Sequence, residues 1–266
     1  MRIILPISGG LDSTYLLWGF LSETEDDITA VFLDLQKYQP VSPFYPNVSY
    51  AAGKKSDLDR VVRLVERLSS ERSFTFQIKD PYPELDGQQN ISLSCYLVEK
   101  ITPLINAGDY DALAIPYEHG NEGHSSRMAG RSAHGFFAAM EIFRASAKRG
   151  KLWLPLMEQK YCQSQAFAEL PQDILDLTLS CEKPTDDKPC GTCFKCSKRE
   201  FFRKRLSLGE TPQQAFAYWM AQATAVKGKW WPTRHWLKYH VPTYEGPVFP
   251  TTWDMPTWPS SVDMAS

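Results

Sequence analysis

The chain has 266 residues, of which 43% are hydrophobic and 23% charged, a composition typical of a soluble globular protein. Its net charge of -2 argues against a general nucleic-acid binder, although it leaves room for local basic patches. No apolar run approaches the roughly 20 residues of a membrane-spanning helix, and the N-terminus lacks a secretory signal. We therefore expect a cytoplasmic protein without membrane contact.

The first predicted element is a buried strand over residues 3–7, and a helix follows the loop after it. A strand that ends in Ser-Gly-Gly and opens a helix gathers several backbone N–H groups at one point. The two glycines have no Cβ, so an oxyanion can approach the backbone, and three hydroxyl groups add donors. The sequence thus predicts a pyrophosphate site rather than a turn that binds nothing. Its residues are Ser8, Gly9, Gly10, Leu11, Asp12, Ser13 and Thr14.

Strands and helices then alternate along the chain. Further strands are predicted over residues 28–34, 74–78, 112–115 and 152–156, with helices over residues 54–70 and 92–106. Strand, helix and strand at this spacing predict parallel units with right-handed crossovers. We therefore predict an α/β fold, with a parallel sheet flanked by helices. The polar stretch over residues 116–124 follows the fourth strand and is either a substrate-contact loop or an ordinary surface loop.

Four clustered cysteines give the second strong signal: Cys181, Cys190, Cys193 and Cys196. In a cytosolic chain such clusters indicate a metal or catalysis more often than disulfides. Four thiolates satisfy a tetrahedral Zn²⁺ and leave no position open, so we expect a structural zinc. Gly191 permits the tight turn between two of the cysteines. An iron–sulfur cluster is the alternative for four cysteines.

The loop at residues 8–14 resembles the SGGxDS loop of the PP-loop ATP pyrophosphatases. Together with residues 155–160, 179–181 and 189–199, it resembles the 7-cyano-7-deazaguanine synthase (QueC-like) family over about residues 1–205. The resemblance implies an adenine nucleotide alpha hydrolase-like, Rossmann-like fold and a homodimer. It also implies an ATP-dependent ligase that adenylates the carboxylate of 7-carboxy-7-deazaguanine. Ammonia then gives the amide, and a second ATP gives the nitrile.

The same resemblance assigns roles to single residues. Ser8, Asp12, Ser13 and Lys160 would be catalytic, with Asp12 near Mg²⁺ and Lys160 supporting the phosphates of ATP. The backbone at Leu33 and Asp34 would meet the adenine. Simpler explanations are a strand-terminal turn for Asp34 and an exposed helix lysine for Lys160.

Three segments follow from these assignments: an ATP-binding domain over residues 1–178, a zinc-binding helical subdomain over 179–225 and a tail over 226–266. The tail is rich in Trp and Pro, and it would wrap its own domain or a dimer mate, or bind a protein partner. Residues 88–90 and 119–124 depart from the family pattern where the base would be recognised. This departure motivates a diverged member of an anti-phage defence operon that conjugates the activated base to a protein amine. An inert nucleotide-binding module and a tRNA-modifying enzyme are further alternatives.

Overall fold

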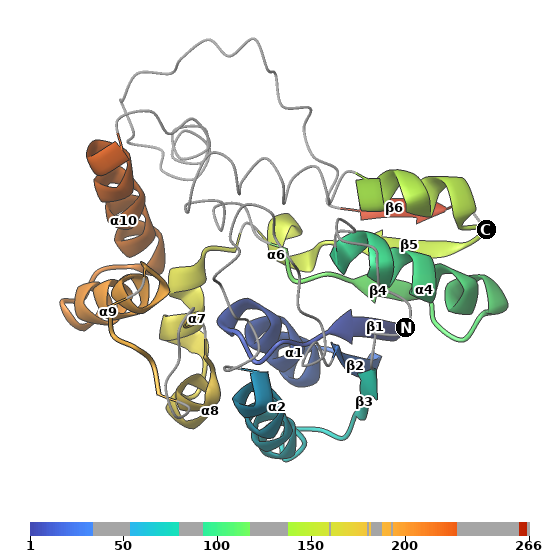
Figure 1. Ribbon diagram of the computed structural model, residues 1–266, viewed down its shortest axis with the longest axis horizontal. Helices are drawn as coiled ribbons and strands as arrows, with labels where there is room; N and C mark the ends of the chain where they lie inside the picture. The colour runs from blue at the N-terminus through green and yellow to red at the C-terminus, as the bar shows by residue number, and fades with distance from the viewer. Residues whose placement is uncertain are drawn as a thin grey trace, which may run out of the picture.

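The computed structural model describes residues 1–33, 54–79, 93–117, 138–159, 161–179, 181, 188–192, 194–227 and 261–264. A six-stranded sheet in the order β3-β2-β1-β4-β5-β6 forms its centre (Figure 1). The strands are β1 (Arg2–Pro6), β2 (Asp27–Leu33), β3 (Thr75–Lys79), β4 (Ala112–Ala114), β5 (Gly150–Trp153) and β6 (Ser261–Met264). The first five strands pair in parallel, and β6 is antiparallel to β5. The predicted fold class, a parallel sheet flanked by helices, is confirmed.

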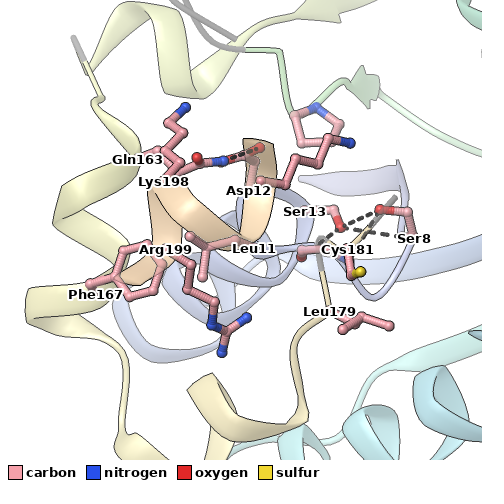
Figure 2. Close-up of a pocket in the computed structure, with 13 residues that line it drawn as sticks. Ser8, Leu11, Asp12, Ser13, Gln163, Phe167, Leu179, Cys181, Lys198 and Arg199 are labelled. Atoms are coloured by element: carbon pink, nitrogen blue, oxygen red, sulfur yellow. Dashed lines mark hydrogen bonds between the residues drawn. The ribbon is translucent and has the colours of Figure 1, made fainter. Parts of the chain in front are cut away.

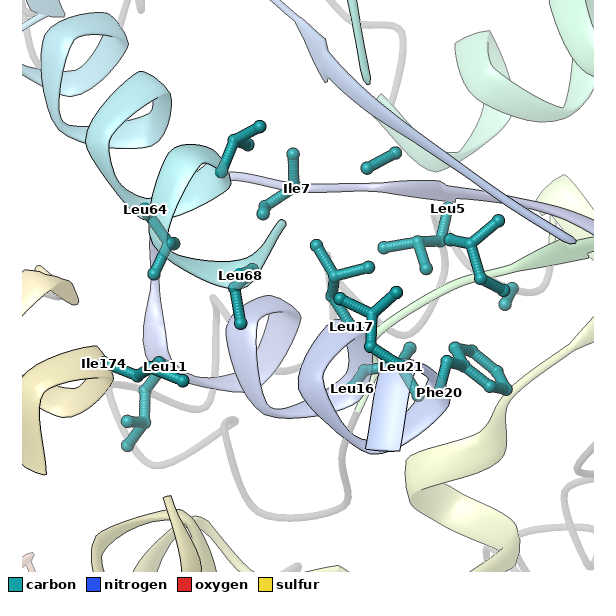
Figure 3. Close-up of a cluster of buried hydrophobic side chains, with 14 of the residues drawn as sticks. Leu5, Ile7, Leu11, Leu16, Leu17, Phe20, Leu21, Leu64, Leu68 and Ile174 are labelled. Carbon is teal, nitrogen blue, oxygen red and sulfur yellow. The ribbon is translucent and has the colours of Figure 1, made fainter. Parts of the chain in front are cut away.

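The central strands are buried on both faces, as their continuous apolar runs predict. Successive side chains of a strand point to opposite faces, so β1 sends Leu5 to one hydrophobic cluster and Ile4 to the other. Helices α1 (Leu11–Glu23) and α2 (Lys54–Leu68) cover the first face. Figure 3 shows their leucines packed against β1. Helix α4 (Leu93–Ala107) and the helical residues 138–146 cover the second face.

Helix α6 (Pro155–Glu158) directly follows β5, and the remaining helices lie at the side of the molecule away from β5 and β6 (Figure 1). They are α7 (Gln163–Glu169), α8 (Gln172–Leu177), α9 (Phe194–Ser207) and α10 (Pro212–Lys227). A third cluster of buried residues, centred on Phe202 and Phe216, packs α9 and α10 against Cys162 and Phe167 near the start of α7. The cysteine-bearing segment is thereby packed onto the α/β part of the chain. The segment boundaries at residues 178 and 225 stay a prediction.

Element boundaries differ from expectation at two places. The first helix begins at Leu11, inside the predicted loop, so residues 11–14 form its first turn. The fifth strand ends at Trp153 because Pro155 takes the first position of α6, where its missing N–H has no consequence. In the tail, residues 261–264 extend the chain's own sheet. None of the helices in the described part of the chain is long and apolar enough to cross a membrane.

Candidate functional site

The strand order reverses between β1 and β4, because the chain builds outward from β1 to β3 and then continues on the other side. In doubly wound sheets ligands bind at this switch point, beyond the carboxyl ends of the strands. A pocket of about 330 Å³ lies there, lined by the loop after β1 and by Pro116 after β4. Its volume falls at the lower end of the range for small-molecule sites.

Two groups of residues from distant parts of the sequence line this pocket. The first, here called the motif wall, consists of Ser8, Gly10, Leu11, Asp12 and Ser13. The second, here called the α9 wall, consists of Lys195, Lys198 and Arg199. Gln163 and Phe167 of α7, and Leu179 and Cys181 of the cysteine segment, complete the lining (Figure 2). Residues far apart in the sequence therefore build one site.

The shape of the motif wall depends on Gly9. Its φ is 70°, in the left-handed region, and a Cβ built there would lie 2.9 Å from Cγ2 of Val61. The N–H of Leu179 donates to the Gly9 carbonyl at 2.9 Å. Gly10, by contrast, caps α1 with an extended backbone at φ -79°. Of the two glycines, Gly9 alone adopts a left-handed backbone conformation. Gly9 does not line the pocket, and its carbonyl and packing hold the loop in place.

The hydroxyl groups of the loop have different tasks. Ser13 Oγ accepts the N–H of Ser8 at 3.2 Å and lies 3.2 Å from Ser8 Oγ, so the two side chains sit together at the pocket. Thr14 is buried, and its hydroxyl donates to the Gly10 carbonyl at 2.7 Å. Ser8 and Ser13 therefore face the pocket as predicted, whereas Thr14 holds the first turn of α1 together.

Asp12 is the single acidic residue among the described residues that line the pocket. Gln163 Nε2 donates to both of its carboxylate oxygens, at 3.0 and 3.1 Å, and the hydroxyl of Tyr161 donates to Oδ1 at 3.1 Å. These donors fix the carboxylate and leave lone pairs for a hard cation such as Mg²⁺. The sequence analysis missed Gln163 and Tyr161, because no motif marks residues that become partners only through the packing of α7 on α1.

A second tyrosine supports this arrangement from outside the pocket. The ring of Tyr15 lies 4.7 Å from that of Tyr161, measured between centroids, and its hydroxyl donates to Glu169. Burial, and next the hydrogen bond to Glu169, raise the pKa of Tyr15 well above its usual value of 10.0. Tyr15 therefore stays neutral and joins α1 to the end of α7.

On the α9 wall, Arg199 is tied to the protein backbone. Its guanidinium donates to the carbonyl and hydroxyl of Thr178 at 2.9 and 3.0 Å, and to the Leu175 carbonyl at 2.6 Å. It also lies 5.6 Å from the ring centroid of Phe167. Burial, and next the charge of Arg203, lower the pKa of Arg199 to about 10. Arg199 therefore fastens α9 to the end of α8.

The cysteine cluster adjoins the same pocket, because Cys181 belongs to both. The sulfur atoms of Cys181, Cys190 and Cys196 lie within 4.8 Å of one another, and those of Cys190 and Cys196 are 3.9 Å apart. Tetrahedral zinc with Zn–S bonds of about 2.3 Å sets its sulfurs about 3.8 Å apart, so the three thiols fit one ion. Gly191 has φ 73°, as the predicted turn requires.

Several predicted residues lie outside the described part of the chain: Asp34, Lys160, the fourth cysteine Cys193, and residues 88–90 and 119–124. Leu33 is described, and it ends β2 as a buried residue beside β1. Leu33 is not among the residues that line the pocket, and its contact with adenine stays a prediction. Three of the four predicted metal ligands are brought together.

Fold and pocket together define a class: a doubly wound α/β protein with a cation-lined pocket at its switch point. No protein-family model matches the chain, and no curated protein matches it in sequence. Among solved structures, the chain is similar to the U34-tRNA thiolase NcsA from Methanococcus maripaludis, solved with its 4Fe-4S cluster. The two are 13% identical, over 84% of this chain and 72% of that chain, with a TM-score of 0.42. What this chain binds is therefore inferred from its own residues.

Proposed function

We propose that this chain is an ATP-dependent enzyme that cleaves ATP to AMP and pyrophosphate in the pocket at the switch point. One observation carries the proposal: the first turn of α1 and three basic side chains line a single pocket. Backbone N–H groups at a helix N-terminus and fixed cations are the donors that a phosphate chain requires. The sequence of the motif wall, Ser-Gly-Gly-Leu-Asp-Ser, supports ATP over other phosphates.

The chemistry fits a site without a nucleophilic side chain. A carboxylate oxygen of the substrate attacks the α-phosphorus of ATP, the bond to the bridging oxygen breaks, and pyrophosphate leaves with the electron pair. The chain's task is to hold the phosphates, neutralise the charge that develops on the leaving group and keep water out. Ser8, Ser13 and the motif-wall backbone would bind the phosphates, and Asp12 would hold Mg²⁺. Lys160 is proposed to assist from the segment after α6.

For the substrate, we propose the carboxylate of 7-carboxy-7-deazaguanine. The support is the combination of the loop at residues 8–14 with the cysteine pattern at residues 181–196, because each motif alone is less specific. Ammonia attack on the acyl adenylate would release AMP and give the amide. A protein amine is the alternative acceptor, motivated by the altered residues 119–124. A homodimer, and a protein partner at the tail, are expected on the same resemblance.

The cysteine site is proposed to hold a structural Zn²⁺ through Cys181, Cys190 and Cys196, with Cys193 as the fourth ligand. The sulfur spacing supports a single ion, since the cysteines of a four-iron cluster bind different irons and stand further apart. A zinc ion supplies no reaction step here and holds the segment between α8 and α9 in place. Metal analysis of the purified protein distinguishes the two: zinc without iron or acid-labile sulfide is expected.

The proposed function is tested by incubating the protein with Mg²⁺, ATP and 7-carboxy-7-deazaguanine and measuring AMP and pyrophosphate. We expect both products in equal amounts, dependent on the base, and with ammonia the amide or nitrile by mass spectrometry. AMP without amide, but with a mass adduct on a co-expressed protein, identifies a protein amine as the acceptor. ATP binding without any AMP contradicts the enzyme and favours an inert nucleotide module.

A further inference from the structure

Lys198 is the most deeply buried basic side chain on the pocket, with 5% of its surface exposed. Its ammonium lies 5.8 Å from the ring centroid of Phe202 and 5.6 Å from that of Phe216, at the long end of cation–π contact. Within the described part of the chain it makes no hydrogen bond or ion pair. Burying a charge without a partner is costly, so the site is built for an anion that arrives with the ligand.

The other two cations of the α9 wall are less suited to this task. Arg199 already donates to Thr178 and Leu175, so its guanidinium is held against the protein backbone. Lys195 is one turn earlier on α9 and only half-buried, so water screens its charge more strongly. Of the three, Lys198 combines burial with unused donors.

From this geometry we infer that Lys198 binds the phosphate oxygens of the nucleotide. The inference rests on the proposed function only in taking the anion to be the pyrophosphate part of ATP. The motif wall contributes backbone N–H groups and hydroxyls, and Asp12 on that wall repels an anion unless Mg²⁺ lies between them. Lys198 supplies the full positive charge that the motif wall lacks. Lys198 lies within the pattern at residues 189–199, but the cysteines of that pattern indicate a metal rather than a phosphate.

Another role for Lys198 is to balance the thiolates of the metal site, since Cys196 is two residues away on the same helix. The two roles make different predictions. Loss of a phosphate-binding lysine lowers the affinity for pyrophosphate and leaves the metal bound. Loss of a charge-balancing lysine weakens metal binding, and any fall in pyrophosphate affinity then accompanies the loss of metal.

The test is calorimetric titration of the metal-loaded protein with inorganic pyrophosphate in the presence of Mg²⁺. In Lys198→Met the stem still packs against Phe202 and Phe216, but the charge is gone. We expect its affinity for pyrophosphate to fall about 10- to 100-fold, the range for a hydrogen bond to a charged group. Lys204→Met is the matched control, because Lys204 is exposed on the same helix; its affinity should not change. Lys198→Arg should recover part of the loss.

Metal content and thermal unfolding are measured on the same samples. Unchanged pyrophosphate affinity in Lys198→Met, or equal losses in Lys198→Met and Lys204→Met, overturns the inference. Loss of metal from Lys198→Met, with or without a change in pyrophosphate affinity, overturns it in favour of charge balance. If Lys198→Met unfolds, Lys198→Gln is titrated in its place, and unchanged pyrophosphate affinity in that folded, uncharged variant overturns the inference. Wild-type protein that binds pyrophosphate through Lys198 but releases no AMP contradicts the proposed function alone, and wild-type protein that binds no pyrophosphate contradicts the inference.

Discussion

The two walls of the pocket would contribute to the proposed phosphate binding in different ways. The motif wall uses a strand, a turn and the start of α1, all within residues 2–14, and its polar groups are mainly backbone N–H groups and short hydroxyls. The α9 wall uses long cationic side chains, and its place depends on contacts with α7, α8 and the cysteine site. The motif wall is therefore encoded locally, and the α9 wall by packing between distant segments.

The largest effect is expected from Asp12→Asn, which removes the one acidic group from the motif wall. The variant is isosteric, but it binds Mg²⁺ poorly, so the rate of AMP formation should fall about 100- to 1,000-fold. Initial rates with radiolabelled ATP measure the change. Asp109→Asn, at an exposed turn after α4, is the control. A rate within threefold of wild type would show that Asp12 has no part in the chemistry.

Removal of the metal should disable the α9 wall and spare the motif wall. Cys190→Ser removes a central ligand, and losing a ligand should weaken metal binding at least about 100-fold, above the range found for outer-shell partners. Pyrophosphate affinity should fall toward that of Lys198→Met, because α9 is no longer fixed beside the pocket. Metal analysis and calorimetry measure both quantities. Cys95→Ser, on α4, is the control and should change neither the metal content nor the pyrophosphate affinity. If metal-free protein keeps its full pyrophosphate affinity, the metal site does not support the pocket.

A smaller effect is expected where the motif wall rests on α2. Gly9→Ala forces a Cβ into the left-handed region and against Val61, so the free energy of unfolding should fall by about 1–2 kcal/mol. Urea denaturation measures the loss. In a Val61→Ala background the steric part disappears and the backbone part remains, so the cost of Gly9→Ala should be lower there. Equal costs in both backgrounds would mean that Val61 does not limit the loop.

The smallest effect concerns Tyr15, which joins α1 to α7 behind the motif wall. Its pKa is raised in the folded protein, so the unfolded chain loses the phenolic proton first as the pH rises. The contribution of neutral Tyr15 to the free energy of unfolding is therefore complete below pH 10 and declines as the pH rises above it. Because Tyr15 is half-buried, solvent screening limits the loss to about 0.5 kcal/mol at pH 11. Denaturation curves at pH 9 and pH 11 give the free energy of unfolding at each pH. In Tyr15→Phe the loss between these two pH values should be smaller by this amount, and an unchanged loss would contradict the prediction.

The parts that sequence reasoning predicted are those with short-range causes. The apolar runs of β1 and β2 predicted a sheet that is buried on both faces, and the residues from Ser8 to Ser13 predicted the turn after β1. The role of the α9 wall was not predicted, because Lys198 becomes a pocket residue only when Phe202 and Phe216 pack onto α7. Gln163 was missed for the same reason, since its partner Asp12 comes from the first helix.

The hydrogen bond from Leu179 to the Gly9 carbonyl also sets an order for events on the ribosome. The strand and turn that carry Gly9 are among the first residues synthesised, and domains generally begin to fold from the N-terminal side. Leu179, whose N–H donates to Gly9, leaves the ribosomal exit tunnel much later, and α9 follows it. The proposed nucleotide site is therefore complete only when most of the polypeptide has been made, so we expect chains truncated before α9 to lack ATP binding.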